Sequence, residues 1–252
     1  MGKFNSLEDK VIVIAGGAKN LGGLLSTTYA KDGAKLVIHY HDEKSLDDAK
    51  ATLSKVEELG GEGTLFSGDL TKVSNVQALF QHAEETFGKV DIAINTVGKV
   101  LKKPISETTE EEFDSMADIN AKSAYFFIKY AEKSMNDNGK IITLATALLA
   151  AYTGFYSTYA GGKAPVEHYT RAASSEFMDR GISVNAVAPG PMDTPFFYPQ
   201  EGEDAVAFHK SQVLHNQLTN IEDIAPIITF LTLDGWWING QTLFANGGYT
   251  TR

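Results

Sequence analysis

The chain has 252 residues, of which 43% are hydrophobic and 21% charged, and this composition excludes disordered and collagen-like proteins. The net charge of −10, with only three arginines, excludes the basic face that duplex nucleic acid requires. The absence of cysteine excludes disulfides, thiolate metal sites and cysteine nucleophiles, and the six histidines show no metal-binding spacing.

Targeting and membrane signals are absent from the sequence pattern. No apolar run approaches the ~20 residues of a membrane span, and the first ten residues carry charges without an apolar segment, unlike a secretory signal. We therefore expect a soluble, cytoplasmic protein with no nucleic-acid or membrane partner.

Predicted strands and helices alternate along the chain. Strands are expected over 11–15, 35–39, 64–67, 90–95, 140–145, 183–187 and 241–244, and helices over 21–32, 43–59, 73–87, 110–136, 158–180 and 221–231. Strands that are apolar throughout are buried on both faces, as in parallel sheets. The pattern predicts one α/β domain over 1–252, a Rossmann-type doubly wound parallel sheet with helices on both faces.

One long irregular stretch interrupts this alternation. It runs from Pro189 to about residue 204 and contains four of the seven prolines and the aromatic run Phe196-Phe197-Tyr198. Long loops in compact domains are often lids, so we expect a substrate lid near 190–216. Its aromatic residues either favour an apolar or aromatic carbonyl substrate or pack the lid on the core.

A glycine-rich turn, Ala15-Gly16-Gly17-Ala18-Lys19-Asn20-Leu21-Gly22-Gly23, follows the first strand. Small residues let the backbone approach a pyrophosphate, and the next helix offers unpaired N–H groups and the positive end of its dipole. The simpler interpretation of this glycine cluster is a tight strand-to-helix turn that binds no ligand. The position after the first strand favours a dinucleotide site.

The end of the second strand bears on cofactor choice. An NAD site places an acid there to bind the ribose, but this chain has Tyr40. Lys19, His41 and Ser45 are suited to hold a 2′-phosphate, which favours NADP(H). The acidic pair Asp42-Glu43 follows directly, so NAD(H) remains possible.

Tyr159 and Lys163 are four residues apart in a predicted helix and therefore share one face. A neighbouring ammonium favours the phenolate, so we expect Lys163 to lower the pKa of Tyr159 toward neutral pH. Thr146 ends the preceding strand and supplies a second hydroxyl. Two hydroxyls near one oxygen are suited to stabilise a developing alkoxide.

In this order, these features resemble the short-chain dehydrogenase/reductase family, in its compact single-domain branch, over the whole chain. The matching segments are Gly16 to Gly22 (TGxxxGxG), Asp69-Leu70 (adenine contact), Asn95 to Gly98 (NNAG), Asn120 (helix asparagine), Thr146 (catalytic serine), Tyr159 to Lys163 (YxxxK), Pro189-Gly190 with Thr194 (PGxxxT) and 239–248 (TGQ…DGG).

The resemblance implies hydride transfer between NADP(H) and a carbonyl or alcohol. Tyr159 would donate the proton, Lys163 would bind the nicotinamide ribose and lower the pKa of Tyr159, Thr146 would polarise the carbonyl, and Asn120 would hold a water that relays protons. The cofactor contacts it implies are Gly16, Lys19, Asn20, Leu21, His41, Ser45, Asp69, Leu70, Asn95, Gly98, Tyr159, Lys163, Pro189, Gly190 and Thr194.

Four positions depart from the family pattern. Ala15 replaces a threonine whose hydroxyl braces the turn, and Thr96-Val97 replaces Asn-Ala at a cost in polar contacts. Asn20 replaces a glycine, but asparagine tolerates left-handed backbone. Thr146 replaces serine, which keeps the donor but stiffens the side chain; we expect activity to survive with an altered substrate choice.

Two alternatives to ketone reduction remain. Tyr156 and Lys163 have the Tyr-x6-Lys spacing of enoyl reductases in the same superfamily, although the turn and Thr146 favour ketone reduction. A non-catalytic NADP(H) sensor is disfavoured because Asn120, Thr146, Tyr159 and Lys163 are all retained.

Aromatic residues in the helix over 110–136 and near the C-terminus exceed what one core face needs, which is typical of subunit contacts. The resemblance implies a homotetramer, with a homodimer as the alternative.

Overall fold

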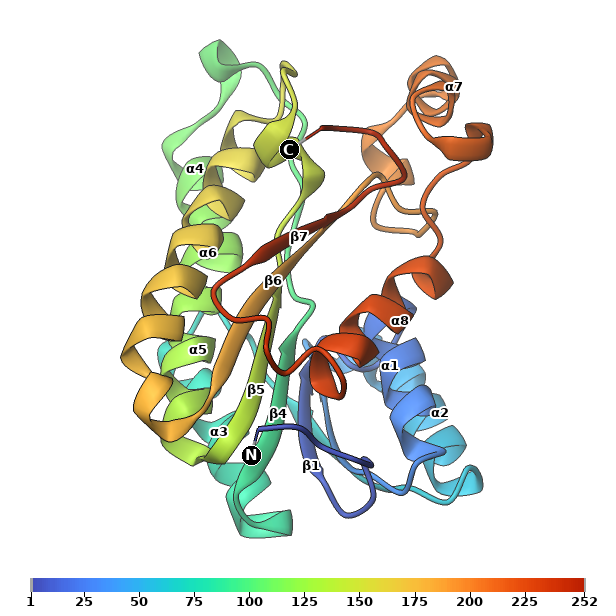
Figure 1. Ribbon diagram of the computed structural model, residues 1–252. Helices are drawn as coiled ribbons and strands as arrows, with labels where there is room; N and C mark the ends of the chain where they lie inside the picture. The colour runs from blue at the N-terminus through green and yellow to red at the C-terminus, as the bar shows by residue number, and fades with distance from the viewer. Residues whose placement is uncertain (1, 252) are drawn as a thin grey trace.

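The structure is a computed structural model that describes residues 2–251. Its centre is a seven-stranded parallel sheet with the strand order β3-β2-β1-β4-β5-β6-β7, which confirms the predicted doubly wound fold (Figure 1). The strands are β1 (Val11–Ala15), β2 (Lys35–Tyr40), β3 (Glu62–Ser67), β4 (Val90–Asn95), β5 (Met135–Leu144), β6 (Ser183–Pro189) and β7 (Thr242–Ala245).

Helices cover both faces of the sheet (Figure 1). One layer contains α1 (Asn20–Ala30), α2 (Leu46–Glu58) and α8 (Ile221–Thr232). The other contains α3 (Val73–Phe87), α4 (Glu110–Ala117), α5 (Ser123–Ser134) and α6 (Ser157–Glu176). A further helix, α7 (Glu203–Ser211), lies apart from both layers in the segment between β6 and α8.

The central strand β1 is a continuous apolar run because both of its faces are buried. In β1, Ile12 and Ile14 belong to one hydrophobic core, whereas Val11 and Val13 belong to the other. Side chains alternate along a strand, so a strand between two helical layers needs apolar residues at every position.

The sheet changes direction of winding between β1 and β4. These strands are adjacent, with Ala15 opposite Asn95, although two strands separate them in the sequence. Open α/β sheets bind ligands at the carboxyl ends of their strands, at such a switch point. The topology therefore predicts a ligand site at the segments that follow Ala15 and Asn95.

Two expected elements differ from the structure. The predicted helix over 110–136 consists of α4, a π-helix (Asp118–Lys122) and α5, and it ends at Ser134 because Met135 already pairs with Val90 in the sheet. The predicted lid is not irregular throughout, since it contains α7. Acids in the first turn of α7 and His209 and Lys210 in the last turn suit the helix dipole, and this signal could have revealed it.

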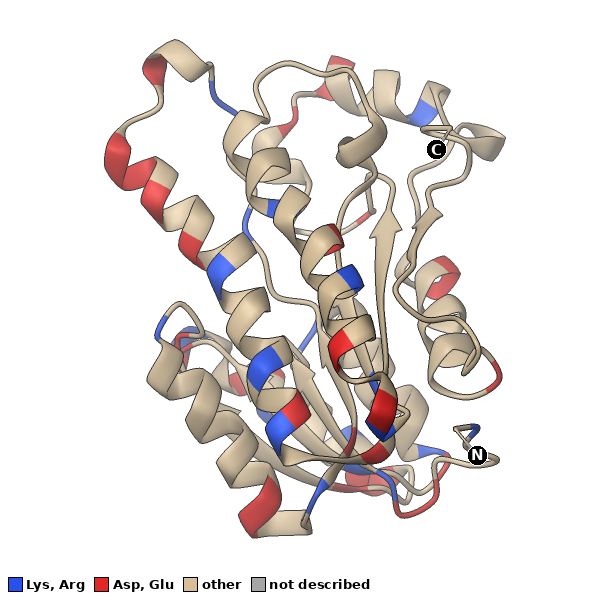
Figure 2. Cartoon of the chain, turned by 60° about the vertical axis from the view of Figure 1, so that its left-hand side comes forward, with Lys and Arg blue, Asp and Glu red and all other residues tan. Residues whose placement is uncertain are grey.

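Charged residues are dispersed along the chain in Figure 2, where Lys and Arg form no continuous stripe. Acidic residues gather at the start of α4, where Glu110, Glu111 and Glu112 occupy the first turn. Within residues 2–251 no helix combines the length and apolar character needed to cross a bilayer.

Candidate active site

A cavity of about 670 Å³ opens at the carboxyl ends of the strands. It brings together all but two of the sequence-predicted site residues. Those that line it are Gly16, Lys19, Asn20, Leu21, His41, Ser45, Asp69, Leu70, Gly98, Thr146, Tyr159, Lys163, Pro189, Gly190 and Thr194. Asn95 and Asn120 are 3% and 0% exposed and lie behind this lining.

The glycine-rich turn requires small residues because its backbone segments nearly touch. A Cβ on Gly22 would lie 2.1 Å from the carbonyl oxygen of Gly16, and Gly16 itself has a φ of +76°. Asn20 has a φ of +49°, as expected for an asparagine in place of the glycine. The turn therefore keeps an open cradle despite this departure from the family pattern.

Thr96 supplies the brace that Ala15 lacks. Its Oγ1 donates to the carbonyl oxygen of Ala15 at 2.8 Å, and its backbone N–H donates to the same oxygen at 3.0 Å. Thr96 thus replaces a hydroxyl missing from the first strand with one from the end of β4. The expected loss of polar contacts at 96–97 is further offset by Asn95, whose Oδ1 accepts from the Val97 N–H at 2.9 Å.

His39 joins two loops of the predicted dinucleotide site, and the sequence analysis missed it. The Gly16 N–H donates to His39 Nδ1 at 3.0 Å, so Nε2 carries the proton and donates to the Gly68 carbonyl at 2.8 Å. The side chain is 2% exposed, and burial lowers its pKa to about 4. A lone histidine within the apolar run of β2 was the available signal.

The three residues expected to hold a 2′-phosphate all line the cavity: Lys19, His41 and Ser45. Lys19 also pairs with Asp48 at 2.9 Å in an exposed ion pair. Asp42 accepts a hydrogen bond from the Lys44 N–H at 3.1 Å and caps a short helical turn. The acidic pair Asp42-Glu43 is outside the lining, which removes the main argument for a ribose-binding acid.

Asp69 and Leu70 line the cavity beside this region. Asp69 Oδ1 accepts from both the N–H and the hydroxyl of Thr71, at 2.9 and 2.8 Å. Burial raises the pKa of Asp69, but these two hydrogen bonds outweigh it, so the net shift is downward and the carboxylate stays ionised.

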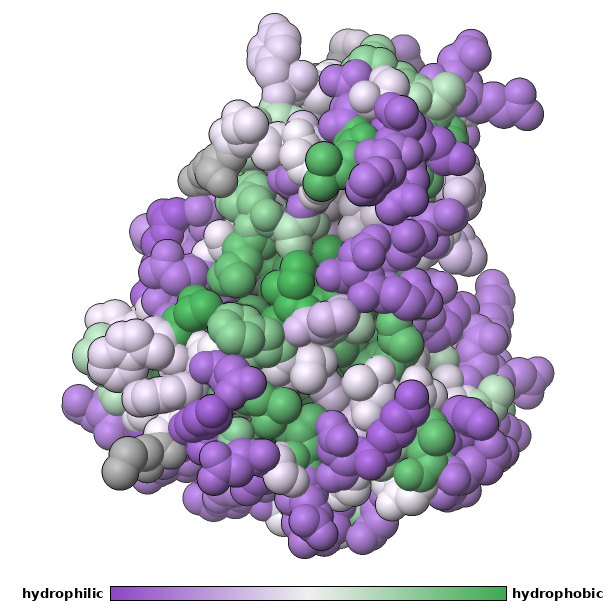
Figure 3. All heavy atoms as spheres, turned by 45° about the vertical axis from the view of Figure 1, so that its right-hand side comes forward, coloured by the Kyte–Doolittle hydropathy of each residue, from purple (hydrophilic) through white to green (hydrophobic). Residues whose placement is uncertain are grey.

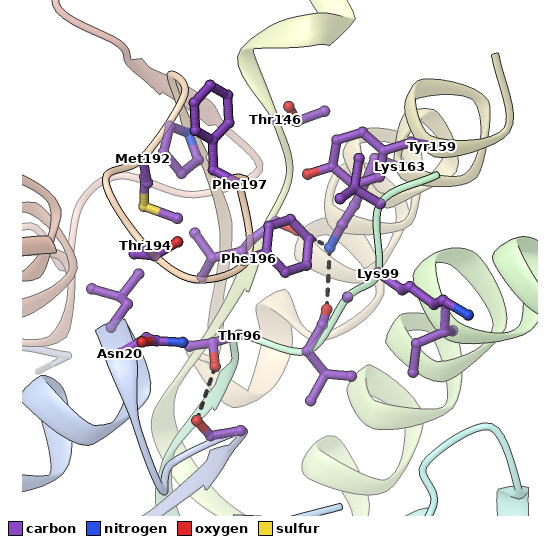
Figure 4. A pocket seen from close by; sticks show the side chains of 18 of the residues that line it. Asn20, Thr96, Lys99, Thr146, Tyr159, Lys163, Met192, Thr194, Phe196 and Phe197 are labelled. Carbon is purple, nitrogen blue, oxygen red and sulfur yellow. Dashed lines mark hydrogen bonds between the residues drawn. The ribbon is translucent and has the colours of Figure 1, made fainter. Parts of the chain in front are cut away.

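Thr146, Tyr159 and Lys163 lie together on one side of the cavity (Figure 4). Lys163 is 4% exposed, and its Nζ donates to the carbonyl oxygens of Leu144 at 2.8 Å and Val97 at 3.2 Å. Burial lowers the pKa of Lys163 to about 8, so the ammonium still predominates at neutral pH.

The expected lowering of the Tyr159 pKa is wrong for the protein alone. Burial raises this pKa, and the hydrogen bond with the Thr146 hydroxyl only partly opposes the shift. The hydroxyl of Thr146 also accepts from the Leu148 N–H at 3.3 Å. Removal of the phenol from water disfavours its charged form, so Tyr159 remains protonated at neutral pH.

Asn120 acts on the site through the backbone. It lies in the π-helix, a feature often found at functional sites. Its Nδ2 donates to the carbonyl oxygens of Lys99 and Met116, and its Oδ1 accepts from the Lys99 N–H. Through these three bonds Asn120 holds the segment after β4 in place. Its Oδ1 accepts one hydrogen bond and keeps a second lone pair, so the predicted contact with a relay water remains a prediction.

The segment after β6 is packed tightly against its neighbours. A Cβ on Gly190 would lie 3.0 Å from Thr219 Oγ1 and 3.2 Å from the Asn246 carbonyl oxygen. Thr194 Oγ1 is buried on the cavity wall and has no hydrogen-bond partner among residues 2–251. An orphaned hydroxyl at this place is suited to a ligand that carries an amide or hydroxyl group.

The lid contributes both apolar and polar side chains to the wall. The Phe196 ring lies 6.3 Å from the Tyr159 ring, and Phe197 also lines the cavity (Figure 4). Tyr198 lies outside the lining, is 43% exposed and donates to Asp193. The lid residues Gln200, Glu201 and His209, which the sequence analysis missed, line the cavity as well.

Comparisons with known proteins agree with this geometry. Residues 16–250 match a family model described as Enoyl-(Acyl carrier protein) reductase. A short-chain type dehydrogenase/reductase of Picea abies is 31% identical over 96% of the chain and 93% of its own length. A hydroxynaphthalene reductase-like protein of Metarhizium brunneum is 30% identical over 98% of the chain and 97% of its own length.

Two crystal structures are more similar in sequence. A dehydrogenase from Burkholderia cenocepacia with bound NADP is 55% identical, with a TM-score of 0.96 and coverage of 98% of this chain and 96% of that one. A short-chain dehydrogenase from Oenococcus oeni is 62% identical, with a TM-score of 0.80 and coverage of 99% and 100%.

Proposed function

The chain belongs to the short-chain dehydrogenase/reductase family, and from this premise we propose that it is an NADP(H)-dependent reductase that converts a ketone to a secondary alcohol. The observation that carries the proposal is the grouping of Thr146, Tyr159 and Lys163 on one wall of a cavity that also contains the glycine-rich turn. A hydride donor and a proton donor would thereby meet the same carbonyl group.

The residues present fit NADP(H). The cradle at Gly16 and Gly22 has no room for a Cβ, as a pyrophosphate site requires. Lys19, His41 and Ser45 line the cavity and would hold the 2′-phosphate, while Asp42 accepts a hydrogen bond within its own turn. The orphaned hydroxyl of Thr194 fits the nicotinamide carboxamide. The Burkholderia protein, 55% identical, was crystallised with NADP.

The cofactor, when bound, supplies the hydride. Tyr159 is protonated at neutral pH. An alkoxide is a much stronger base than a phenolate, so Tyr159 can give its proton to the alkoxide as it develops. The Thr146 hydroxyl donates to the same oxygen, so two preorganised donors stabilise the charge as it forms.

Lys163 completes the group. Its ammonium is fixed between the carbonyl oxygens of Leu144 and Val97, one helical turn from Tyr159. A positive charge held there favours negative charge on the phenolic oxygen after the proton has left. Lys163 also faces the cavity where the nicotinamide ribose would lie.

Reduction of an enoyl thioester is the second candidate, because the matching family model carries that description and Tyr156 lines the cavity. Ketone reduction is favoured because the Thr146 hydroxyl interacts with Tyr159. The name of the Metarhizium relative, a reductase of hydroxynaphthalenes, also fits reduction of a carbonyl tautomer better than of an acyl chain.

The experiment is turnover of the purified protein with NADPH or NADH and a panel of ketones, a 3-oxoacyl thioester and an enoyl thioester, followed by absorbance of the reduced nicotinamide. We expect oxidation of NADPH with a ketone and formation of the alcohol. Turnover of the enoyl thioester alone would favour the second candidate, and turnover with NADH alone would contradict the roles of Lys19, His41 and Ser45.

A further inference from the structure

Glu201 is a buried acidic side chain of the lid that forms an ion pair with a lysine. Its side chain is 1% exposed, and its Oε2 accepts from Lys102 Nζ at 2.6 Å. The second oxygen, Oε1, is buried and has no hydrogen-bond partner among the described residues. Glu201 lines the same cavity as Tyr159.

Other polar groups surround this carboxylate. His209 Nε2 lies 3.6 Å from Glu201 Oε2, and His209 Nδ1 lies 3.0 Å from the hydroxyl of Tyr249. Gln200 accepts from the backbone N–H of Lys102 at 3.1 Å. Gln200, His209 and Tyr249 all line the cavity, so the lid, the segment after β4 and the C-terminal segment build one polar wall.

This wall lies within reach of the reacting centre. Lys102 Nζ sits 5.6 Å from the centre of the Tyr156 ring, and Tyr156 precedes Tyr159 by three residues at the start of α6. Residues three apart in a helix are neighbours on its surface. Phe196 and Glu201 line the same cavity as Tyr159, so a substrate whose carbonyl meets Tyr159 would share this cavity with both side chains.

The charges of the wall select the kind of group it accepts. Lys102 already balances Glu201, and burial lowers the pKa of His209, which leaves this imidazole neutral at pH 7. A cationic ligand would find no net negative charge. A buried carboxylate oxygen without a donor is costly, and a neutral hydroxyl would supply that donor without adding charge.

We propose that the substrate is a neutral hydroxylated ketone whose hydroxyl group donates a hydrogen bond to Glu201 Oε1. This inference rests on the proposed ketone reduction and makes Glu201 the residue that determines specificity. The lid aromatics alone favour an apolar or aromatic carbonyl substrate, and Glu201 adds one polar contact to that expectation.

The test compares matched ketones that differ by one hydroxyl: 4-hydroxy-2-butanone with 2-butanone, and 1-hydroxy-2-pentanone with 2-pentanone. In the wild-type protein we expect kcat/KM to favour a hydroxylated ketone by roughly ten- to a hundredfold, the range for a hydrogen bond to a charged group. In Glu201→Gln this preference should fall about tenfold or more, mainly through KM.

Two controls separate recognition from folding. Glu203→Gln removes the same charge from an exposed site in the same lid, and it should leave the preference unchanged. The double variant Lys102→Met/Glu201→Met removes the ion pair without leaving an unpaired charge. It should lose the preference as Glu201→Gln does, and its NADPH affinity reports whether the variant is folded.

Ligand-observed NMR of 1,3-butanediol and 2-butanol with the NADPH-loaded protein gives a readout without turnover, because the reduced cofactor cannot accept a hydride from either alcohol. Tighter binding of the diol to the wild type than to Glu201→Gln would support the role of Glu201 even if no ketone were reduced, and only the proposed function would then fail. Reduction of both ketones with no hydroxyl preference, or with a preference that survives in Glu201→Gln, would overturn the inference and leave ketone reduction standing.

Discussion

His39 links the phosphate-binding turn to the loop that carries Asp69. It does so only as a neutral imidazole, because Nδ1 must accept the Gly16 N–H while Nε2 donates to Gly68. Protonation would place a second donor against Gly16 and a charge in a site that is 2% exposed. The stability of the cofactor turn should therefore depend on pH.

We predict a loss of stability below pH 6.5 that originates at His39. The folded-state pKa is about 4 against an ordinary value of 6.5, so between these pH values the unfolded chain binds more protons and the free energy of unfolding falls as the pH falls. At ~1.4 kcal/mol per pKa unit, the loss is about 3 kcal/mol by pH 4.

Urea unfolding at pH 7, 5.5 and 4.5 measures this effect in the wild type, His39→Asn and His215→Asn. His39→Asn should flatten the pH dependence, whereas the exposed His215 is the matched control and should not. An unchanged slope in His39→Asn would show that other groups cause the acid sensitivity.

For single residues, the sequence predicts some members of the site and does not predict others. Tyr159, Lys163 and Thr146 could be identified because helical spacing and a strand end fix their relative places. Thr96 and Glu201 could not, because their partners, Ala15 and Lys102, are 81 and 99 residues away in sequence. The raised pKa of Tyr159 was missed because spacing reveals a neighbouring charge but not the extent of burial.

Among the elements, α6 must pass close to the π-helix to present Tyr159 and Lys163. A Cβ on Gly162 would lie 3.1 Å from Asn120 Cβ and 3.3 Å from the Met116 carbonyl oxygen, whereas a Cβ on Gly161 would meet nothing within 4 Å. The close approach of α6 to the π-helix therefore requires a glycine at 162 but not at 161.

We predict opposite outcomes for two alanine substitutions. Gly161→Ala should raise the free energy of unfolding by about 0.5–1 kcal/mol, the usual gain for alanine over glycine in a helix. Gly162→Ala should lose that gain and lower kcat, because the new methyl group pushes α6 away from Asn120. Denaturant unfolding with activity measurements tests both; equal stabilisation by the two variants would contradict the close approach.

Element positions were predictable where burial alone decides them. The strands matched because apolar runs between two helical layers have few alternatives. The sequence did not predict that the helix over 110–136 is divided by a π-helix. The π-helix widens one turn by a residue, and its sequence contains no glycine or proline that would indicate it. The end of that helix was missed because Met135 suits a helix and a strand equally, and only its pairing with Val90 decides.

On the scale of the whole molecule, apolar side chains remain on the surface. Phe113 on α4 and Tyr125 on α5 are 57% and 50% exposed, and the Tyr125 ring packs edge-on against Tyr169 of α6. A second face shows apolar residues gathered in its middle between polar ends (Figure 3); after α8, Trp237 is 82% exposed. Patches of this kind are typical of subunit contacts.

We predict a homotetramer, with a mass near four times the 27.3 kDa of one chain. Tyr125→Asp would place a charged group in the apolar α4–α5 surface and should shift the protein to smaller species. Phe208→Asp, on the exposed side of the lid, is the control and should not. Analytical ultracentrifugation at micromolar concentration measures this; a wild type that sediments only as monomer would remove the prediction.

The account as a whole depends on Tyr159 as the proton donor to a ketone. The most direct measurement is kcat for NADPH-dependent ketone reduction by the wild type, Tyr159→Phe and Tyr156→Phe, with NADPH affinity measured for each protein. Loss of a positioned general acid lowers rates by about 10²–10⁴-fold, and we expect a loss of this size in Tyr159→Phe with NADPH affinity retained. Full activity in Tyr159→Phe together with its loss in Tyr156→Phe would contradict the mechanism.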